Sequence, residues 1–243
     1  MPPTLDRARP RSSSETVRRV LAAAVFLPIF YYLVHDLGAI AFFGLAAIAG
    51  MLAAGEFYRL HLGQAPWPWW CWLGVGATGL LISSAQWPTL VTDRAVLLGT
   101  LAIALCMPLL SGKSLRDSLT DGMVLVMGVL YLGLTLSYLV LTRGLPDGAL
   151  LIFFVFLVTW AGDTGAYVAG KSMGRHALAP VISPKKTYEG LAGGLVLACL
   201  MAVVARAWFL PAFSLVDCLA LGMILTITGL IGDFGVMRLG TAG

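Results

Sequence analysis

The sequence predicts an all-α protein, a polytopic bundle of about eight membrane-spanning helices with a cytoplasmic N-terminus. Of the 243 residues, 59% are hydrophobic and only 12% are charged, whereas a soluble domain carries about 25% charged residues. The apolar residues gather in runs that are long enough to cross a bilayer as helix. Because backbone N–H and C=O groups need internal partners in lipid, these runs must be helical. Basic residues gather in alternate connections between the runs, which sets the orientation.

Eight apolar runs follow a polar stretch, residues 1–16, that we expect to be a disordered cytoplasmic tail. The predicted spans are residues 17–34, 38–58, 67–83, 95–110, 119–141, 149–170, 188–210 and 214–231. Four cysteines lie in or beside these runs without a CxxC pair, so we predict small buried side chains rather than disulfides or a zinc site. They are Cys71, Cys106, Cys199 and Cys218.

The positions of the basic residues support both the number of spans and their orientation. With the tail inside, thirteen of the sixteen Lys and Arg residues fall in inside segments, and two, Arg94 and Arg143, fall outside. The sixteenth, Arg206, lies in the outer part of the seventh run and can snorkel outward. This split follows the positive-inside rule. The net charge of +4 therefore reflects topology and favours membrane lipids, not nucleic acid, as partners. We expect a multi-pass protein of the cell inner membrane with its polar working face in the cytoplasm.

The longest connection between spans, residues 171–187, is rich in bases and turn formers and lies between two acids, Asp163 and Glu189. A carboxylate inside an apolar span costs about 2.5–3.5 kcal/mol, so it normally faces a partner or a wet cavity. Asp163 is therefore either a metal ligand or proton acceptor, or an interfacial aspartate paired with Lys171 or Arg175. Its position alone leaves both interpretations open.

The end of this connection has the features of a phosphate site. Ser183 or Thr187 could cap the following helix, and Pro184 suits a first helical turn. Free N–H groups there, together with Lys185 and Lys186, would bind phosphate. The alternative is that these lysines are ordinary basic residues at a membrane edge.

A third acid, Asp233, follows Gly232 at the inner end of the last span, an arrangement similar to that of Asp163. Two aspartates on separate helices at one depth could hold one Mg²⁺, which prefers a few carboxylates together with water and phosphate oxygens. An aspartate without a partner at a helix C-terminus would be unfavourable against the helix dipole, which favours a role for Asp233.

Residues 162–194 resemble a known family, the phosphatidate cytidylyltransferases, also called CDP-diacylglycerol synthases. The matching motifs are Gly-Asp-Thr-Gly-Ala-Tyr at 162–167, Gly-Lys at 170–171, Gly-Arg-His at 174–176, Leu-Ala-Pro at 178–180, Ile-Ser-Pro-Lys-Lys-Thr-Tyr-Glu-Gly at 182–190 and Gly-Gly at 193–194. Two further elements agree, Glu-Phe-Tyr-Arg-Leu at 56–60 and Ile-Gly-Asp at 231–233.

The resemblance implies a reaction in which the phosphate of phosphatidic acid attacks the α-phosphorus of CTP, giving CDP-diacylglycerol and pyrophosphate with Mg²⁺ as cofactor. CTP and phosphatidic acid would be the partners, and a homodimer is left open. Asp163 and Asp233 would be Mg²⁺ ligands. Lys185 and Lys186 would hold the triphosphate or the lipid headgroup. The remaining expected substrate-binding residues are Ser183 and Thr187 as donors to phosphate, Tyr188 and Glu189 as supports of the loop, and Lys171 and Arg175.

The sequence departs from the family after Asp233. The family's last motif continues with basic residues and a further metal-binding carboxylate, whereas this chain reads Phe-Gly-Val-Met-Arg-Leu-Gly-Thr-Ala-Gly from residue 234 and stops. We therefore expect residues 17–243 to form an integral membrane cytidylyltransferase domain that is truncated relative to the family. Three alternatives remain: a CTP-dependent polyprenol or lipid kinase, an inactive membrane remnant, and a membrane protein without catalysis.

Overall fold

The computed structural model describes residues 28–36, 38–63, 65–180 and 183–240, with the backbone alone for 184 and 235–240. The predicted tail and most of the first predicted span lie outside these residues. Residues 28–35 are helical. The further elements are α2 (Ala39–Leu62), α3 (Trp69–Gln86), α4 (Asp93–Leu110), α5 (Leu115–Gly128), the π-helical η1 (Val129–Leu134), α6 (Thr135–Arg143), α7 (Gly148–Met173), β1 (Ala177–Ala179), β2 (Ser183–Thr187), α8 (Tyr188–Trp208) and α9 (Leu215–Gly240).

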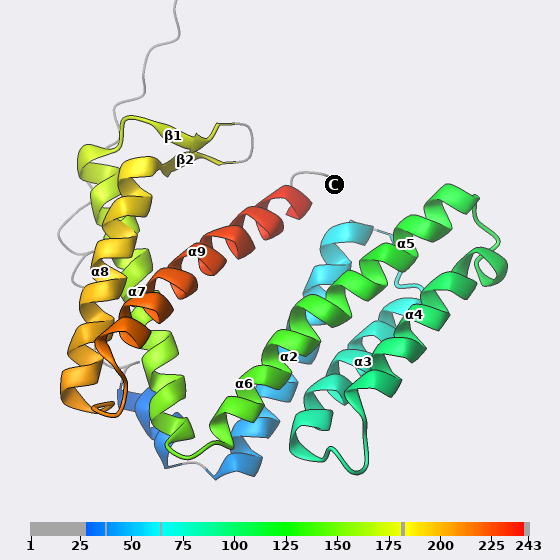
Figure 1. Cartoon of the computed structure of the whole chain (residues 1–243). Helices are drawn as coiled ribbons and strands as arrows, with labels where there is room; N and C mark the ends of the chain where they lie inside the picture. The colour runs from blue at the N-terminus through cyan, green and yellow to red at the C-terminus, as the bar shows by residue number, and fades with distance from the viewer. Residues whose placement is uncertain (1–27, 37, 64, 181–182, 241–243) are drawn as a thin grey trace, which may run out of the picture.

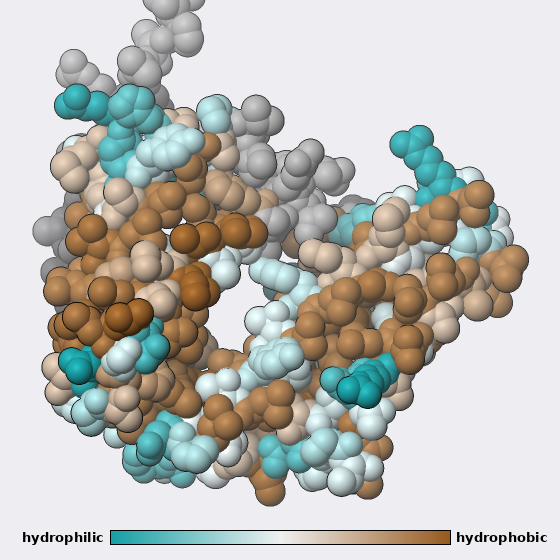
Figure 2. All heavy atoms as spheres, viewed as in Figure 1, coloured by the Kyte–Doolittle hydropathy of each residue, from teal (hydrophilic) through white to brown (hydrophobic). Residues whose placement is uncertain are grey.

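The described chain is a polytopic helical membrane bundle. Six helical segments are long and apolar enough to cross a membrane, and one of them runs without interruption through α5, η1 and α6. They are Ala39–Leu62, Asp93–Leu110, Leu115–Arg143, Gly148–Met173, Tyr188–Trp208 and Leu215–Phe234. Figure 2 shows apolar side chains over the middle of the molecule and hydrophilic ones gathered toward its upper and lower ends. Among the predicted spans, the third corresponds to α3, which is not one of the six.

The helices form two groups, each with its own core. In the first group α3 packs against α2, α4, α6 and η1, around a cluster that includes Tyr58, Trp70 and Leu125. In the second group α8 packs against α7 and α9, around Phe154 and Val158. Figure 1 shows α7 and α8 side by side, while α9 starts at their lower end and leans away from them as it rises.

Small residues allow α7 and α8 to approach closely. A Cβ atom added to Gly165 would lie 2.5 Å from the backbone oxygen of Gly193 and 2.8 Å from Cβ of Leu197. Glycine at such contacts lets two membrane helices bring their backbones together. This contact holds the α7–α8 pair, which carries most of the residues discussed below.

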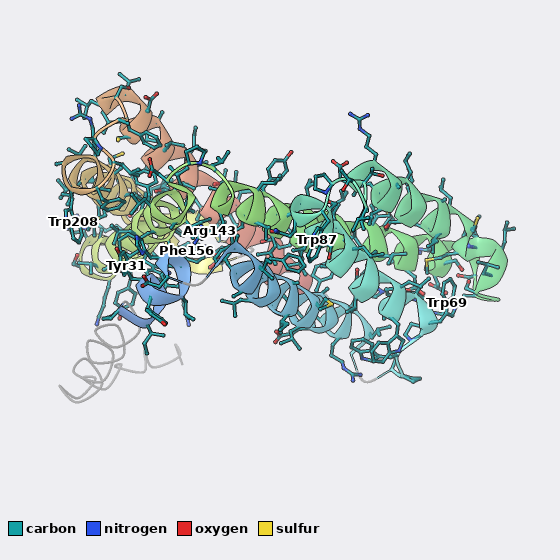
Figure 3. The ribbon with its side chains drawn as sticks, turned by 90° about the horizontal axis from the view of Figure 1, so that it is seen from below. Tyr31, Trp69, Trp87, Arg143, Phe156 and Trp208 are labelled. Carbon is teal, nitrogen blue, oxygen red and sulfur yellow. The ribbon has the colours of Figure 1, made fainter. Side chains whose placement is uncertain are left out.

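The helix at residues 28–35 joins the second group at its lower end. Arg143, the last residue of α6, donates from Nε to the backbone oxygen of Val34 over 2.9 Å. Phe30 packs edge-on against Phe156 of α7. Figure 3, seen from below, shows Arg143 and Phe156 beside Tyr31 of this helix. These contacts connect residues 28–35 to the turn between α6 and α7.

Two local expectations need correction. The connection before α8 contains a short antiparallel hairpin, β1–β2, which pairs Ala177 with Thr187 and Ala179 with Ser183. Ser183 is therefore a buried strand residue and not a helix cap, and Pro184 lies within β2 and not in a first helical turn. Thr187 is the cap, since its side chain accepts a hydrogen bond from the Gly190 N–H.

All four cysteines are free, as expected, but their burial differs from the expectation. Cys71 and Cys218 are buried, Cys199 is intermediate and Cys106 is exposed. Cys106 lies on α4, whose candidate span has few buried residues. Its exposed side is therefore a surface that faces lipid when the helix spans a membrane.

Candidate functional site

A cavity of about 350 Å³ lies between α7, α9, the hairpin and the first turn of α8. This volume is in the range of small-molecule sites, about 300–1,000 Å³. Its walls combine charged side chains with small and apolar residues. They are Thr159, Gly162, Asp163, Ala166, Tyr167, Gly170, Leu178, Lys185, Lys186, Thr187, Gly190, Leu191, Leu225, Thr226, Gly229, Leu230 and Asp233.

The two aspartates that the sequence singled out lie on opposite walls of this cavity. Asp163 belongs to α7 and Asp233 to α9, and both line the cavity. Lys186 of the hairpin lines the same cavity. The acid inside the predicted sixth span therefore faces a cavity shared with a second acid and a lysine. Lys171, considered above as a partner of Asp163, has its ammonium over the ring of Tyr167, 5.7 Å from the centroid.

Strand β2 brings two lysines to the same cavity. Nζ of Lys186 lies 2.6 Å from Oδ2 of Asp233, which ties the hairpin to α9. The same ammonium lies over the ring of Phe234, 4.9 Å from its centroid. Lys185 lines the cavity as well. Positive and negative charges from three separate elements thus meet in one place.

Glu189, in the first turn of α8, fastens the base of the hairpin. Its Oε2 accepts hydrogen bonds from the backbone N–H groups of Arg175 (3.1 Å) and His176 (3.3 Å). Its Oε1 lies 2.6 Å from Nδ1 of His176. The Tyr188 N–H donates to the His176 oxygen over 3.0 Å. Together these bonds fix the start of β1 to the start of α8, and thereby the position of the strand that carries the lysines.

The predicted site residues thus fall into two sets. Asp163, Lys185, Lys186, Thr187 and Asp233 line the cavity. The others lie outside its lining, so their role in binding substrate stays a prediction. They are Ser183, Tyr188, Glu189, Lys171 and Arg175.

Several lining residues were not singled out from the sequence. Thr159 lies four residues before Asp163 on α7, and Gly229 and Thr226 lie four and seven residues before Asp233 on α9. Residues at these spacings share one helix face. Counting back by helical turns from each aspartate would therefore have found them. His176 lacked such a signal, because its contact with Glu189 spans thirteen residues.

The carboxylates of the cavity could bind a hard cation such as Mg²⁺ only together with oxygen ligands from a substrate or from water. Within the described residues, no group of three or more His, Cys, Asp and Glu side chains could hold a metal ion. Mg²⁺ is usually bound by one or two carboxylates, with waters and substrate phosphates supplying the other oxygens. Asp163 and Asp233, which line the same cavity, are the carboxylates available for such a site.

Comparison with known proteins shows the family of the chain. Residues 17–236 match the model of the cytidylyltransferase family. A phosphatidate cytidylyltransferase of Staphylococcus haemolyticus is 30% identical over 233 residues, covering 90% of this chain and 81% of that protein. One from Staphylococcus aureus is 31% identical over 228 residues with the same coverage. One from Staphylococcus saprophyticus is 40% identical over 118 residues, which are 49% of this chain and 45% of that protein. The chain therefore belongs to the cytidylyltransferase family.

Proposed function

We propose that this chain is a phosphatidate cytidylyltransferase and that the cavity between α7, α9 and the hairpin is its active site. There CTP and phosphatidic acid would react to give CDP-diacylglycerol and pyrophosphate. The observation that carries the proposal is the meeting of Asp163, Asp233, Lys185 and Lys186 on the walls of one cavity, in a chain whose relatives bear this name.

The reaction joins two groups of like charge, so the site must first neutralise them. Lys185 and Lys186 would hold phosphate oxygens, as charge-assisted donors do in phosphate sites. The N-terminus of α8 lies beside them and adds backbone N–H groups and the positive end of a helix dipole. Thr187 both begins this helix and lines the cavity. These groups would place the triphosphate against the wall formed by the hairpin and the N-terminus of α8.

Asp163 and Asp233 would hold Mg²⁺, which supplies charge neutralisation and orients the phosphate groups when bound. In the structure Lys186 holds Asp233 at 2.6 Å. A phosphate bound beside this pair lies within reach of the same ammonium. A phosphate oxygen of phosphatidic acid would form the new bond to the α-phosphorus of CTP, and the bond to the pyrophosphate oxygen would break. Positioning and electrostatic stabilisation would supply most of the rate.

The order of the helices supports a cytoplasmic site. Successive helices alternate in direction, so the hairpin lies on the same face as the α2–α3 and α4–α5 connections. Figure 1 shows the hairpin and the upper end of α9 on one side and the turn between α6 and α7 on the other. The hairpin side carries most of the basic residues, which supports a cytoplasmic position for it under the positive-inside rule. We propose eight spans, a cytoplasmic N-terminus and an inner-membrane location; a homodimer stays an expectation.

A product assay tests the proposal. The purified chain in nanodiscs would be given dioleoyl phosphatidic acid, CTP and Mg²⁺, and pyrophosphate and nucleotide products would be separated. We expect pyrophosphate and CDP-diacylglycerol from the wild type, and a loss of both in Asp163→Asn. Release of CDP with a phosphorylated lipid would instead identify a lipid kinase. If neither pyrophosphate nor CDP is released, an enzymatic role for this chain is refuted.

A further inference from the structure

A π-helical turn interrupts the regular α-helix of the longest candidate span. Residues Val129–Leu134 form η1 within the continuous helix Leu115–Arg143. The Thr135 N–H donates to the Leu132 oxygen, and the Thr135 hydroxyl donates to the Tyr131 backbone oxygen. Single π-turns inside α-helices are often found at functional sites. The turn is therefore a candidate functional segment outside the cavity described above.

Two glycines hold η1 against the first group of helices. A Cβ atom added to Gly128, just before the turn, would lie 2.6 Å from Cε1 of Tyr58 on α2. A Cβ atom added to Gly133 would lie 3.1 Å from Cδ2 of Leu81 on α3. One face of the turn is therefore closely packed against its own helix group. Tyr131, in contrast, is 37% exposed.

The side chain of Tyr131 reaches the second group of helices, next to a proposed metal ligand. A Cβ atom added to Gly232 of α9 would lie 3.2 Å from the hydroxyl oxygen of Tyr131, so only glycine leaves this approach unhindered. Asp233 follows directly, and its carboxylate lies 2.6 Å from Nζ of Lys186. Successive residues of an α-helix point about 100° apart. Gly232 therefore faces η1, while Asp233 faces the hairpin.

The inner end of α9 needs support on the side of the first helix group. The main neighbours of α9 are α8 and α7, and α9 leans away from both as it rises (Figure 1). Asp163 lies on α7 and Asp233 on α9, so the separation of the two carboxylates depends on how far α9 leans. Tyr131 contacts α9 from the direction toward which it leans, and thereby limits this movement.

We propose that Tyr131 is a positioning residue for the cation site. Held by η1, its side chain supports α9 at Gly232 and thereby fixes Asp233 relative to Asp163. This inference rests on the proposed function, in which the two aspartates hold Mg²⁺, and it gives the first helix group a part in that site. Tyr131 lies outside the cavity lining, so it acts through α9. Groups that orient metal ligands contribute about 10–100-fold to metal affinity or activity.

The matched variants are Tyr131→Leu and Tyr138→Leu, with Tyr131→Phe as the conservative change. Tyr138 lies about two turns further along the same continuous helix, is 61% exposed and is also outside the cavity lining. Both leucine variants replace an exposed tyrosine by the same shorter apolar side chain. Tyr131→Leu withdraws the group that reaches Gly232, whereas Tyr131→Phe keeps the ring.

The contact itself is tested by photo-crosslinking of the full chain in nanodiscs. Benzoylphenylalanine is incorporated in place of Tyr131 or of Tyr138, and the adducts are mapped by mass spectrometry. We expect adducts on α9 around residues 228–234 from position 131 and none there from position 138. This measurement requires neither a bound metal nor turnover.

The effect on the cation site is tested by metal binding. Mn²⁺, as a paramagnetic substitute for Mg²⁺, is titrated in the presence of CTP and followed by electron paramagnetic resonance. We expect the Mn²⁺ affinity to fall about tenfold in Tyr131→Leu with little change in Tm, and to stay near wild type in Tyr131→Phe and Tyr138→Leu. Where turnover is measured, the KM for Mg²⁺ should rise while kcat at saturating Mg²⁺ is largely retained.

The outcomes separate this inference from the proposed function. Wild-type Mn²⁺ affinity in Tyr131→Leu, or no adducts on α9 from position 131, would overturn the role of Tyr131 even if the wild type releases pyrophosphate. A fall in Tm that parallels the loss of affinity would overturn it as well, because the tyrosine would then act through the fold. Wild-type chain that neither binds Mn²⁺ with CTP nor releases pyrophosphate would refute the proposed function, and with it the role in the cation site, whatever the adducts show.

Discussion

Replacing Lys186 by methionine keeps the length of the side chain but removes the charge that lies 2.6 Å from Asp233. The structure gives this ammonium two roles, one in stability and one in activity, and we expect their energetic contributions to differ. It connects the hairpin to α9 through Asp233, and it lines the cavity in which we place the triphosphate. The Lys186→Met variant should affect stability and activity to very different extents.

The effect on stability should be small, because the ion pair is only partly shielded from water. The side chains of Lys186 and Asp233 are 24% and 63% exposed, and such pairs contribute about 0–1 kcal/mol. The effect on activity should be large. Removing one preorganised donor from a site of developing charge costs about 10²–10³-fold in rate, or about 2.7–4 kcal/mol.

Two measurements on one preparation check this expectation. Pyrophosphate release gives kcat and KM for CTP, and thermal unfolding in the same detergent gives the stability. We expect activity to fall by at least about 100-fold while Tm changes little. A variant with near wild-type activity would show that Lys186 does not contact the reacting phosphates. A large fall in Tm that parallels the loss of activity would show that the lysine acts through the fold.

Three further predictions concern the elements around the cavity. Thr187→Ala should destabilise the start of α8 by about 1 kcal/mol, as measured by thermal unfolding. Thr187→Ser should retain the cap, because serine keeps the hydroxyl. Equal losses of stability in both variants would contradict the capping role. Gly165→Leu should destabilise the α7–α8 contact by about 1–3 kcal/mol or more, because the new side chain meets the backbone of α8. Gly44→Leu on α2 should leave Tm unchanged, because an added Cβ there has no atom within 4 Å. Similar Tm values for the two variants would refute the close-packing argument. Glu189→Gln should increase amide hydrogen exchange at Arg175 and His176, because their N–H groups donate hydrogen bonds to this carboxylate. Unchanged protection of these amides would show that the base of the hairpin is held by other contacts.

The membrane architecture could be predicted from sequence because its cause is compositional. Long apolar runs have one stable form in a bilayer, and six of the predicted runs correspond to candidate spans. The meeting of Asp163 and Asp233 was also predictable, since acids at the inner ends of two spans share one depth. For both aspartates to line one cavity, α7 and α9 must also be neighbours. No local sequence pattern predicts which helices pack together.

The hairpin and its fastening were not predictable in the same way. Strand β1 has three residues, and β2 contains a proline and two lysines, so neither has the apolar alternation typical of strands. The contact of Glu189 with the amides at 175 and 176 depends on the turn that the hairpin makes. Such contacts follow from the three-dimensional path of the chain and leave no periodic signal.

The most direct test of the central claim is the Mg²⁺ dependence of CTP binding. Isothermal titration of CTP into the purified chain, with and without Mg²⁺, would be repeated on Asp163→Asn and on Gly44→Leu as control. We predict that Mg²⁺ strengthens CTP binding in the wild type and in the control, and that this effect is lost in Asp163→Asn. An equal response to Mg²⁺ in all three proteins would contradict the assignment of the α7–α9 cavity as the site of the cation and the nucleotide phosphates.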